Sequence, residues 1–294
     1  QQGMQWHQGG FLAEAEAIYR QVLASHAKHV DALHLLGVLC AQTGRAAEGV
    51  GLIQQAVKLN GLAPALHSNL ANALLACGRA QEAVASASKA LALQPTFVDA
   101  LCSKGNALRE LRRLVEAVAS YDQAIALNPQ IPEVWSNRGN ALSDLHRHAE
   151  AVASFDRALA LRPQFPDAWC NRGAALSEQG LLDEALQSYG QALALKPAYP
   201  EALNNRANTL REMGRLQDAV EAFEQALSAR PDYPDALSNL GVTLQEIGRQ
   251  DEAIARYRQA LSLQGDHLKA RSNLLFSLSF DPNCTPQAYL AEAR

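Results

Sequence analysis

Apolar residues recur along the chain at intervals of three and four residues, and glycine or proline interrupts this spacing at regular points. The spacing places apolar side chains on one face of an α-helix. Glycines such as Gly78 and Gly214 predict the end of one helix, and prolines such as Pro129 predict the end of the next. Arg112 and His146 stand where other pairs have this glycine, so strained turns are expected there. The pattern predicts an all-α chain built from pairs of helices.

The pairs of helices recur with a period of 34 residues, which is typical of repeat architectures. The predicted repeats begin at Val30, Pro64, Val98, Pro132, Pro166, Pro200 and Pro234. Residues 1–29 fit the same frame without its first five positions, so residues 1–267 form eight repeats, the first truncated at its N-terminal end. Residues 268–294 are predicted to form a C-terminal capping helix and the start of a following segment. Both ends fall inside helices of this frame, and we expect the chain to be a fragment.

At two positions of the repeat frame, the side chains differ in size in the same way along the chain, and each such set of equivalent positions is called a column here. The difference predicts how the two helices of a pair pack against each other. The eighth position is always small: Gly3, Gly37, Ala71, Gly105, Gly139, Gly173, Ala207 and Gly241. The twenty-fourth position is large except at Ala87: Tyr19, Ile53, Tyr121, Phe155, Tyr189, Phe223 and Tyr257. With the bulky residues at the fourth position, such as Leu33 and Trp135, this pattern resembles the tetratricopeptide repeat. The resemblance implies an α-solenoid of stacked helical hairpins, coiled into a right-handed superhelix, whose first helices line a concave groove.

Positions 2, 6, 9 and 13 of the frame share one face of each first helix, and this face is polar. Asparagine recurs at the sixth position as Asn69, Asn137, Asn171, Asn205, Asn239 and Asn273, and at the ninth as Asn72, Asn106, Asn140 and Asn208. An amide offers donors and an acceptor, so it can bind the C=O and N–H of a peptide unit whatever its side chain. We expect these ten residues to bind an extended peptide. The alternative is that they hydrogen-bond to neighbouring helices of the solenoid.

Carboxylates occupy the other two columns of the polar face. They are Asp31, Asp99, Glu133, Asp167, Glu201 and Asp235 at the second position, and Glu110, Asp144, Glu178, Glu212 and Glu246 at the thirteenth. An acid in the first turn also favours the helix dipole, which requires no ligand. If the acids contact a ligand, they favour segments that carry Lys or Arg.

Charge and composition exclude several classes of function. The 26 basic and 30 acidic residues give a net charge of −4 without a Lys/Arg-rich block, which argues against nucleic acid as a partner. No run of 18 apolar residues could span a membrane, and residues 1–10 lack the features of a signal peptide. No C-x-x-C pair occurs among the cysteines, which are Cys40, Cys77, Cys102, Cys170 and Cys284. We therefore expect a cytoplasmic protein without disulfides, metal or cofactor.

Motifs of phosphate-binding loops, zinc hydrolases and serine hydrolases are absent, so no catalytic residues and no enzymatic activity are predicted for this chain. The stretch from Asn273 to Pro282, with Thr285-Pro286 and Tyr289 to Arg294, resembles the segment that joins the repeats to the catalytic half in bacterial relatives of the protein O-GlcNAc transferase and SPINDLY glycosyltransferases. The asparagine column at the sixth position also resembles that family's asparagine ladder. The resemblance carries over to Asn137, Asn171, Asn205, Asn239 and Asn273, whereas Leu35 and Ser103 interrupt the column.

The sequence therefore predicts a protein-interaction module that binds extended protein segments. By the second resemblance, this module is the substrate-recognition part of a parent protein that transfers a sugar from a nucleotide-sugar donor to Ser or Thr. Two alternatives remain open. One is a free-standing scaffold or adaptor with no fused enzyme, and the other is a solenoid that associates with itself through its exposed ends.

Overall fold

The computed structural model describes residues 2–280 and 285–292. Every regular element in these residues is a helix, so the predicted all-α class, a solenoid of helical hairpins, is confirmed. The chain forms two compact units, residues 1–161 and 162–294.

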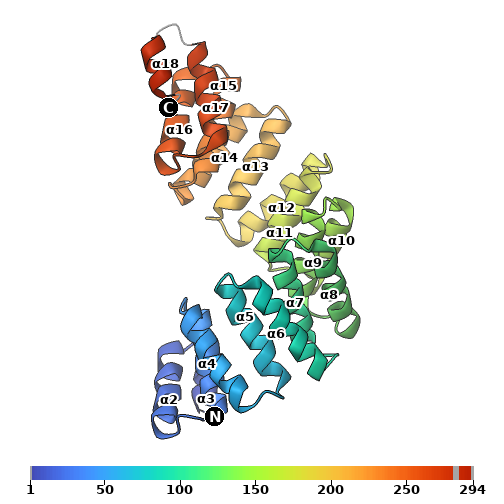
Figure 1. Ribbon diagram of the computed structural model, residues 1–294. Coiled ribbons are helices and arrows are strands. Elements are labelled where there is room, and N and C mark those ends of the chain that lie inside the picture. Colours follow the sequence, from blue (N-terminus) through green and yellow to red (C-terminus); the bar gives the residue numbers. More distant parts are fainter. Residues whose placement is uncertain (1, 281–284, 293–294) are drawn as a thin grey trace. The chain divides into compact units, whose positions relative to one another are not determined.

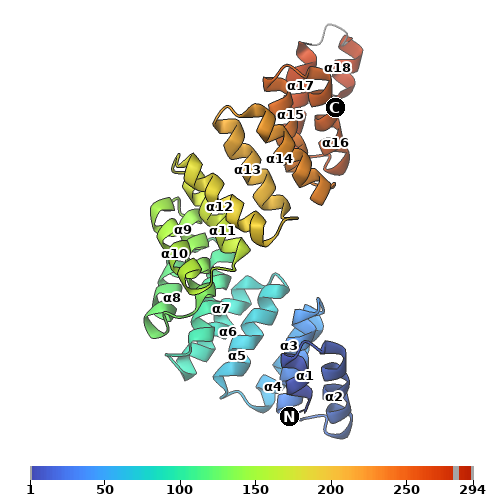
Figure 2. The ribbon, with the colours of Figure 1, turned by 180° about the vertical axis from the view of Figure 1, so that it is seen from behind.

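Unit 1 is a series of helical hairpins in which consecutive helices pack against each other, as α3 does against α4 and α5 against α6 (Figure 1). Its first hairpin, α1 with α2, is clearest in Figure 2. The helices are α1 (Gln2–Gln8), α2 (Leu12–Ser25), α3 (Val30–Gln42), α4 (Ala46–Leu59), α5 (Pro64–Ala76), α6 (Ala80–Leu93), α7 (Val98–Glu110), α8 (Leu114–Leu127), α9 (Pro132–Asp144) and α10 (His148–Leu161).

Unit 2 repeats the same arrangement, with α11 against α12, α13 against α14 and α15 against α16. Its helices are α11 (Pro166–Ser177), α12 (Leu182–Leu195), α13 (Pro200–Glu212), α14 (Leu216–Ala229), α15 (Pro234–Glu246), α16 (Gln250–Leu263), α17 (Leu268–Ser279) and α18 (Pro286–Glu292). In both units, the first helix of each full-length repeat begins at the residue that the 34-residue frame marks as its start.

The small and large columns meet inside each hairpin. A Cβ added to Gly139 would lie 2.7 Å from Cε1 of Phe155, and one added to Gly173 would lie 2.7 Å from Cε1 of Tyr189. Phe155 is fully buried and Tyr189 almost so. The ring therefore occupies the volume that the missing side chain leaves, and this contact sets how closely the two helices approach.

The turn inside each hairpin needs a left-handed residue, and glycine supplies it at Gly78 and Gly214, with φ of 71° and 74°. Arg112 and His146 adopt the same conformation with φ of 58° and 57°. A residue with a Cβ is disfavoured there by roughly 1–2 kcal/mol. The prediction of strain at these two turns is confirmed.

Candidate functional site

The polar face of unit 1 is hollowed where α5, α7 and α9 lie next to one another. Leu75, Asn106, Arg109, Glu110 and Asn137 line a hollow of about 260 Å³. Two of the predicted peptide-binding asparagines are therefore brought to one place, with a guanidinium and a carboxylate beside them. Asn106 and Asn137 are half-buried, whereas Glu110 is exposed.

The amides in this hollow are also bonded to the protein. Asn137 Nδ2 donates to Asn106 Oδ1 at 3.2 Å, and the Tyr121 hydroxyl donates to the same oxygen at 2.7 Å. The carbonyl of Asn106 thus accepts two hydrogen bonds, which is its full capacity. Asn137 uses one of its two N–H groups in this contact, so the other N–H and the carbonyl are the groups available to a ligand.

The same kind of bridge joins other neighbouring repeats. Within unit 1, Asn69 Nδ2 donates to His34 Nε2 at 2.7 Å. Within unit 2, Asn239 Nδ2 donates to Asn204 Oδ1 at 3.2 Å, and Asn205 Nδ2 lies 4.0 Å from Cys170 Sγ. The structural role that the sequence left open for the asparagines is therefore present at these positions. The residues that accept these bonds stand at the fifth position of the preceding repeat, and sequence reasoning missed them.

The remaining predicted asparagines divide into two groups. Asn72 Oδ1 accepts a hydrogen bond of 2.7 Å from the hydroxyl of Ser103, and Asn140 and Asn171 also interact within the protein. By contrast, the half-buried side chains of Asn208 and Asn273 make no hydrogen bond to the described residues. These two amides have their whole bonding capacity for a ligand or for water.

All three second-position acids in unit 2 have a partner in the loop that ends their own repeat. The Tyr199 hydroxyl donates to Asp167 Oδ1 at 2.8 Å, and His267 Nε2 lies 3.2 Å from Asp235 Oδ1. Burial raises the pKa of the Glu201 carboxyl, but the hydrogen bond and charge of Arg230, a backbone hydrogen bond and the charge of Lys196 together hold this pKa below its usual value. These contacts are specific, and a favourable helix dipole alone does not account for them.

Some of the thirteenth-position acids form ion pairs within the described residues, and others do not. In unit 1, Arg109 Nε donates to Asp144 Oδ2 at 2.8 Å, and in unit 2, Arg211 Nη1 lies 3.6 Å from Glu246 Oε1. Glu110 and Glu212 are exposed and form no ion pair with the described residues. The polar face thus combines half-buried amides with exposed carboxylates, which suits a ligand that offers peptide groups and positive charge.

Two cysteines on first helices, Cys102 on α7 and Cys170 on α11, have thiols of low reactivity. Burial raises the pKa of the Cys102 and Cys170 thiols to about 11, so both are protonated and weakly nucleophilic at neutral pH. Cys284 lies outside the described residues. In the part of the chain that the structure covers, no three His, Cys, Asp or Glu side chains gather as a metal site requires.

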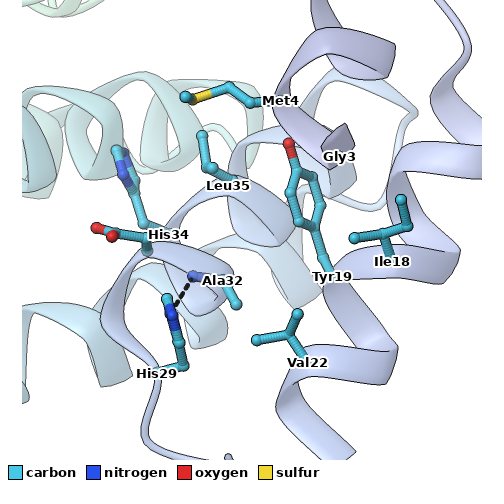
Figure 3. Close-up of a pocket in the computed structure, with 10 residues that line it drawn as sticks. Gly3, Met4, Ile18, Tyr19, Val22, His29, Ala32, His34 and Leu35 are labelled. Carbon is cyan, nitrogen blue, oxygen red and sulfur yellow. Dashed lines mark hydrogen bonds between the residues drawn. The ribbon is translucent and has the colours of Figure 1, made fainter. Parts of the chain in front are cut away.

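A larger hollow of about 620 Å³ lies at the start of unit 1, between α1, α2 and α3, where Met4, Tyr19, Val22 and Leu35 surround it (Figure 3). Val22 and Ala32, which line this hollow, stand at the twenty-seventh position of one repeat and the third position of the next. In other repeats, the residues at these two positions pack against the fourth-position side chain. Two apolar clusters show this packing. The fourth-position residue Leu33 packs with Ala56 and Leu66, and Leu237 packs with Ala260 and Ala270. The shape of this hollow therefore follows from repeat packing and does not by itself indicate a ligand.

Acidification is expected to weaken unit 1 through His34. An amide NH₂ can only donate, so the bond from Asn69 requires an unprotonated Nε2. Desolvation lowers the pKa of His34 below its ordinary value of 6.5, although Asp31 acts in the opposite direction. The unfolded chain binds this proton near pH 6.5 and the folded chain only at lower pH. The free energy of unfolding therefore falls as the pH drops below 6.5.

Urea unfolding of the wild type and of His34→Gln at pH 7.5 and pH 5.5 measures this contribution. Glutamine keeps an acceptor for Asn69 but does not titrate, so we expect a smaller loss of stability on acidification in the variant. Equal losses in the two proteins would contradict the assignment to His34.

None of the helices in the described residues combines the length and the apolar character that a bilayer span requires. Family models described as tetratricopeptide repeat match residues 8–67, 64–88, 164–232 and 198–266, and one described as TPR repeat matches residues 105–146 and 144–180. No curated protein matches the chain.

Solved structures give the same result for the fold. The chain is similar to one in the APC/C hetero-tetramer Cut9-Hcn1, with a TM-score of 0.72, 15% identity, and coverage of 91% of this chain and 52% of that chain. A tetratricopeptide repeat protein from Parabacteroides merdae matches with a TM-score of 0.67, 19% identity, and coverage of 85% and 98%. PilW, a type IV pilus biogenesis factor, matches with a TM-score of 0.67, 26% identity, and coverage of 72% and 98%. The chain spans about half the length of the Cut9-Hcn1 chain, and at 15% and 19% identity the likeness shows the fold alone.

Proposed function

Because the chain belongs to the tetratricopeptide repeat family, we propose that it is a protein-interaction module whose polar face binds extended protein segments. The observation that carries this proposal is the hollow of unit 1, in which Asn106 and Asn137 stand half-buried beside Arg109 and Glu110. A half-buried amide bonds to a peptide group more favourably than a fully exposed one, because less competing water surrounds it.

The arrangement favours weak and broad binding. Each hydrogen bond between an amide and the ligand backbone contributes only about 0.5–1.5 kcal/mol net. Ordering a flexible segment consumes much of the sum over several such bonds. Since Asn137 and Asn239 each use one N–H group within the protein, such an amide keeps one N–H and a carbonyl that accepts two hydrogen bonds, so three bonds to a ligand are its limit.

Asn208→Ala tests the proposal, since this side chain makes no hydrogen bond to the described residues and its loss leaves the bridges between repeats intact. With a pool of fluorescent 15-residue peptides of random sequence as the probe, we expect about five-fold weaker binding in fluorescence polarisation, which corresponds to about 1 kcal/mol. Asn60→Ala, an exposed asparagine at the end of α4, is the matched control. Unchanged binding by Asn208→Ala combined with Asn273→Ala would contradict the role of the asparagines.

We further propose that the module selects acceptor proteins for an O-linked glycosyltransferase of the O-GlcNAc transferase and SPINDLY type, in the cytoplasm. The support is the resemblance of the stretch that begins at Asn273, of which residues 281–284, 293 and 294 lie outside the described residues. The half-buried side chain of Asn273 on α17 continues the sixth-position column. The mass of the native protein, captured from its source cells with an antibody against these 294 residues, tests this. A mass well above 31.7 kDa and sugar transfer to co-captured proteins are expected, whereas a mass near 31.7 kDa would favour the free-standing scaffold.

A further inference from the structure

The polar face of unit 2 changes character at α17. At the ninth position α17 carries Phe276, where the other first helices carry Asn, Ala, Val or Met. Phe280, the C-cap residue of α17, stands at the thirteenth position, where the other repeats carry an acid, Gln or Ala. Their side chains are 56% and 69% exposed. The two rings meet edge to face, with centroids 5.0 Å apart. Val242, at the ninth position of α15, is half-buried.

Within residues 162–280 and 285–292, packing leaves these rings exposed. α18 packs against α17, and its Tyr289 lies against the apolar cluster that contains Leu274 and Leu278. Arg258 Nε also donates to Glu292 Oε1 at 2.8 Å, which joins α16 to α18. The side of α17 that faces its neighbours is thus occupied, while two large aromatic side chains on its polar face remain in water. Neighbouring exposed rings of this kind mark an interaction surface.

Negative charge leads up to the aromatic pair along the thirteenth-position column. Glu212 on α13 is exposed and forms no ion pair with the described residues. Glu246 on α15 faces Arg211 at 3.6 Å, which is a long and partly exposed contact. Phe280, the C-cap residue of α17, is the next member of the column. Beside this column, Asn205 and Asn239 provide the amides of the proposed peptide site.

We infer that unit 2 recognises extended segments in which a Lys or Arg and a bulky apolar residue stand about six residues apart. The basic side chain faces Glu212, and the apolar side chain packs on Phe276 and Phe280. Packed helices lie about 10 Å apart and an extended chain rises about 3.3 Å per residue, so roughly three residues span one repeat. α13 and α17 are separated by two repeat steps. This inference rests on the proposed function, which supplies the backbone contacts.

Three 14-residue fluorescent peptides with a Gly/Ser/Gln background test the inference on the full 294-residue chain. The first carries Lys and Leu six residues apart in either order, the second replaces its Leu with Ser, and the third replaces its Lys with Gln. We expect the first to bind about ten-fold more tightly than either of the others. Phe276→Ser combined with Phe280→Ser should remove the preference for Leu, and Glu212→Gln should remove the preference for Lys. Phe11→Ser, which changes a 59% exposed ring in unit 1, should remove neither.

Equal binding of the three peptides, or a preference for Leu that survives the loss of both rings, would overturn the inference. If that equal binding is still weakened by Asn208→Ala, the proposed function stands while the aromatic anchor fails. If the wild type binds none of the peptides and none of the random pool, the proposed function fails with it. Since both rings are exposed, we expect their replacement to leave the core intact, and circular dichroism of each variant tests whether it is folded.

Discussion

Replacement of Phe155 with alanine is expected to lower the free energy of unfolding by about 3–5 kcal/mol. The ring is fully buried and fills the space above Gly139, where an added Cβ would lie only 2.7 Å from Cε1. Because the surroundings of a deleted ring relax only partly, we expect the variant to keep a cavity. Equilibrium urea unfolding followed by circular dichroism measures the loss.

A second substitution makes this prediction specific to the pairing of the two columns. Gly139→Ala alone should cost about 1–3 kcal/mol, because its Cβ meets the ring. In the Phe155→Ala background the same change should cost little or should stabilise, since it fills part of the cavity. The chain contains this combination naturally at Ala71 and Ala87, both fully buried. Val115→Ala, at a 69% exposed position, is the control and should be near neutral. Additive losses in the double variant would contradict the pairing.

The sequence predicted these packing features because they depend on size and repeat with the period. Gly139 and Phe155 differ in size as the columns require, and the left-handed turn at Arg112 follows from the glycines at equivalent positions. The structure confirms both, because steric exclusion at these positions is decided within one hairpin and depends little on the rest of the chain.

The hydrogen bonds of the polar face could not be predicted in the same way. The residues that accept from Asn69, Asn205 and Asn239 are a histidine, a cysteine and an asparagine, which share a position but no chemistry. Each pair is separated by 35 residues, one more than the repeat period, because the bond crosses to the fifth position of the preceding repeat. Polar residues separated by 35 positions, rather than by 34, are the signal in the sequence that identifies these hydrogen bonds.

The exposed aromatic pair illustrates a different limit. Phe276 and Phe280 have the spacing of a buried helical face, and apolar residues at such spacing are usually interior. The repeat frame puts both rings at polar-face positions, and the structure shows that they are exposed there, since Leu274 and Leu278 of the same helix occupy the interior instead. Apolar content alone could not decide which of two faces of α17 is buried.

Simultaneous replacement of Asn171, Asn205 and Asn239, which all belong to unit 2, with alanine is expected to weaken peptide binding to that unit by roughly 100-fold. Each amide contributes about 1 kcal/mol to a bound backbone, and three such losses correspond to about two orders of magnitude in the dissociation constant. The measurement is fluorescence polarisation with the random 15-residue peptide pool, over a concentration range wide enough to detect binding at the reduced affinity.

Stability must be separated from binding in this variant, because the same amides bridge repeats. Asn239→Ala removes the donor to Asn204 Oδ1, and Asn205→Ala removes the weak contact with Cys170 Sγ. Ile53→Val, at a fully buried position away from the polar face, should cost about 0.5–1.5 kcal/mol of stability and serves as the control. If stability alone governed binding, Ile53→Val would also weaken capture. We expect capture to be retained in this control and lost in the triple variant, and full capture by a folded triple variant would refute the role of the asparagines in binding.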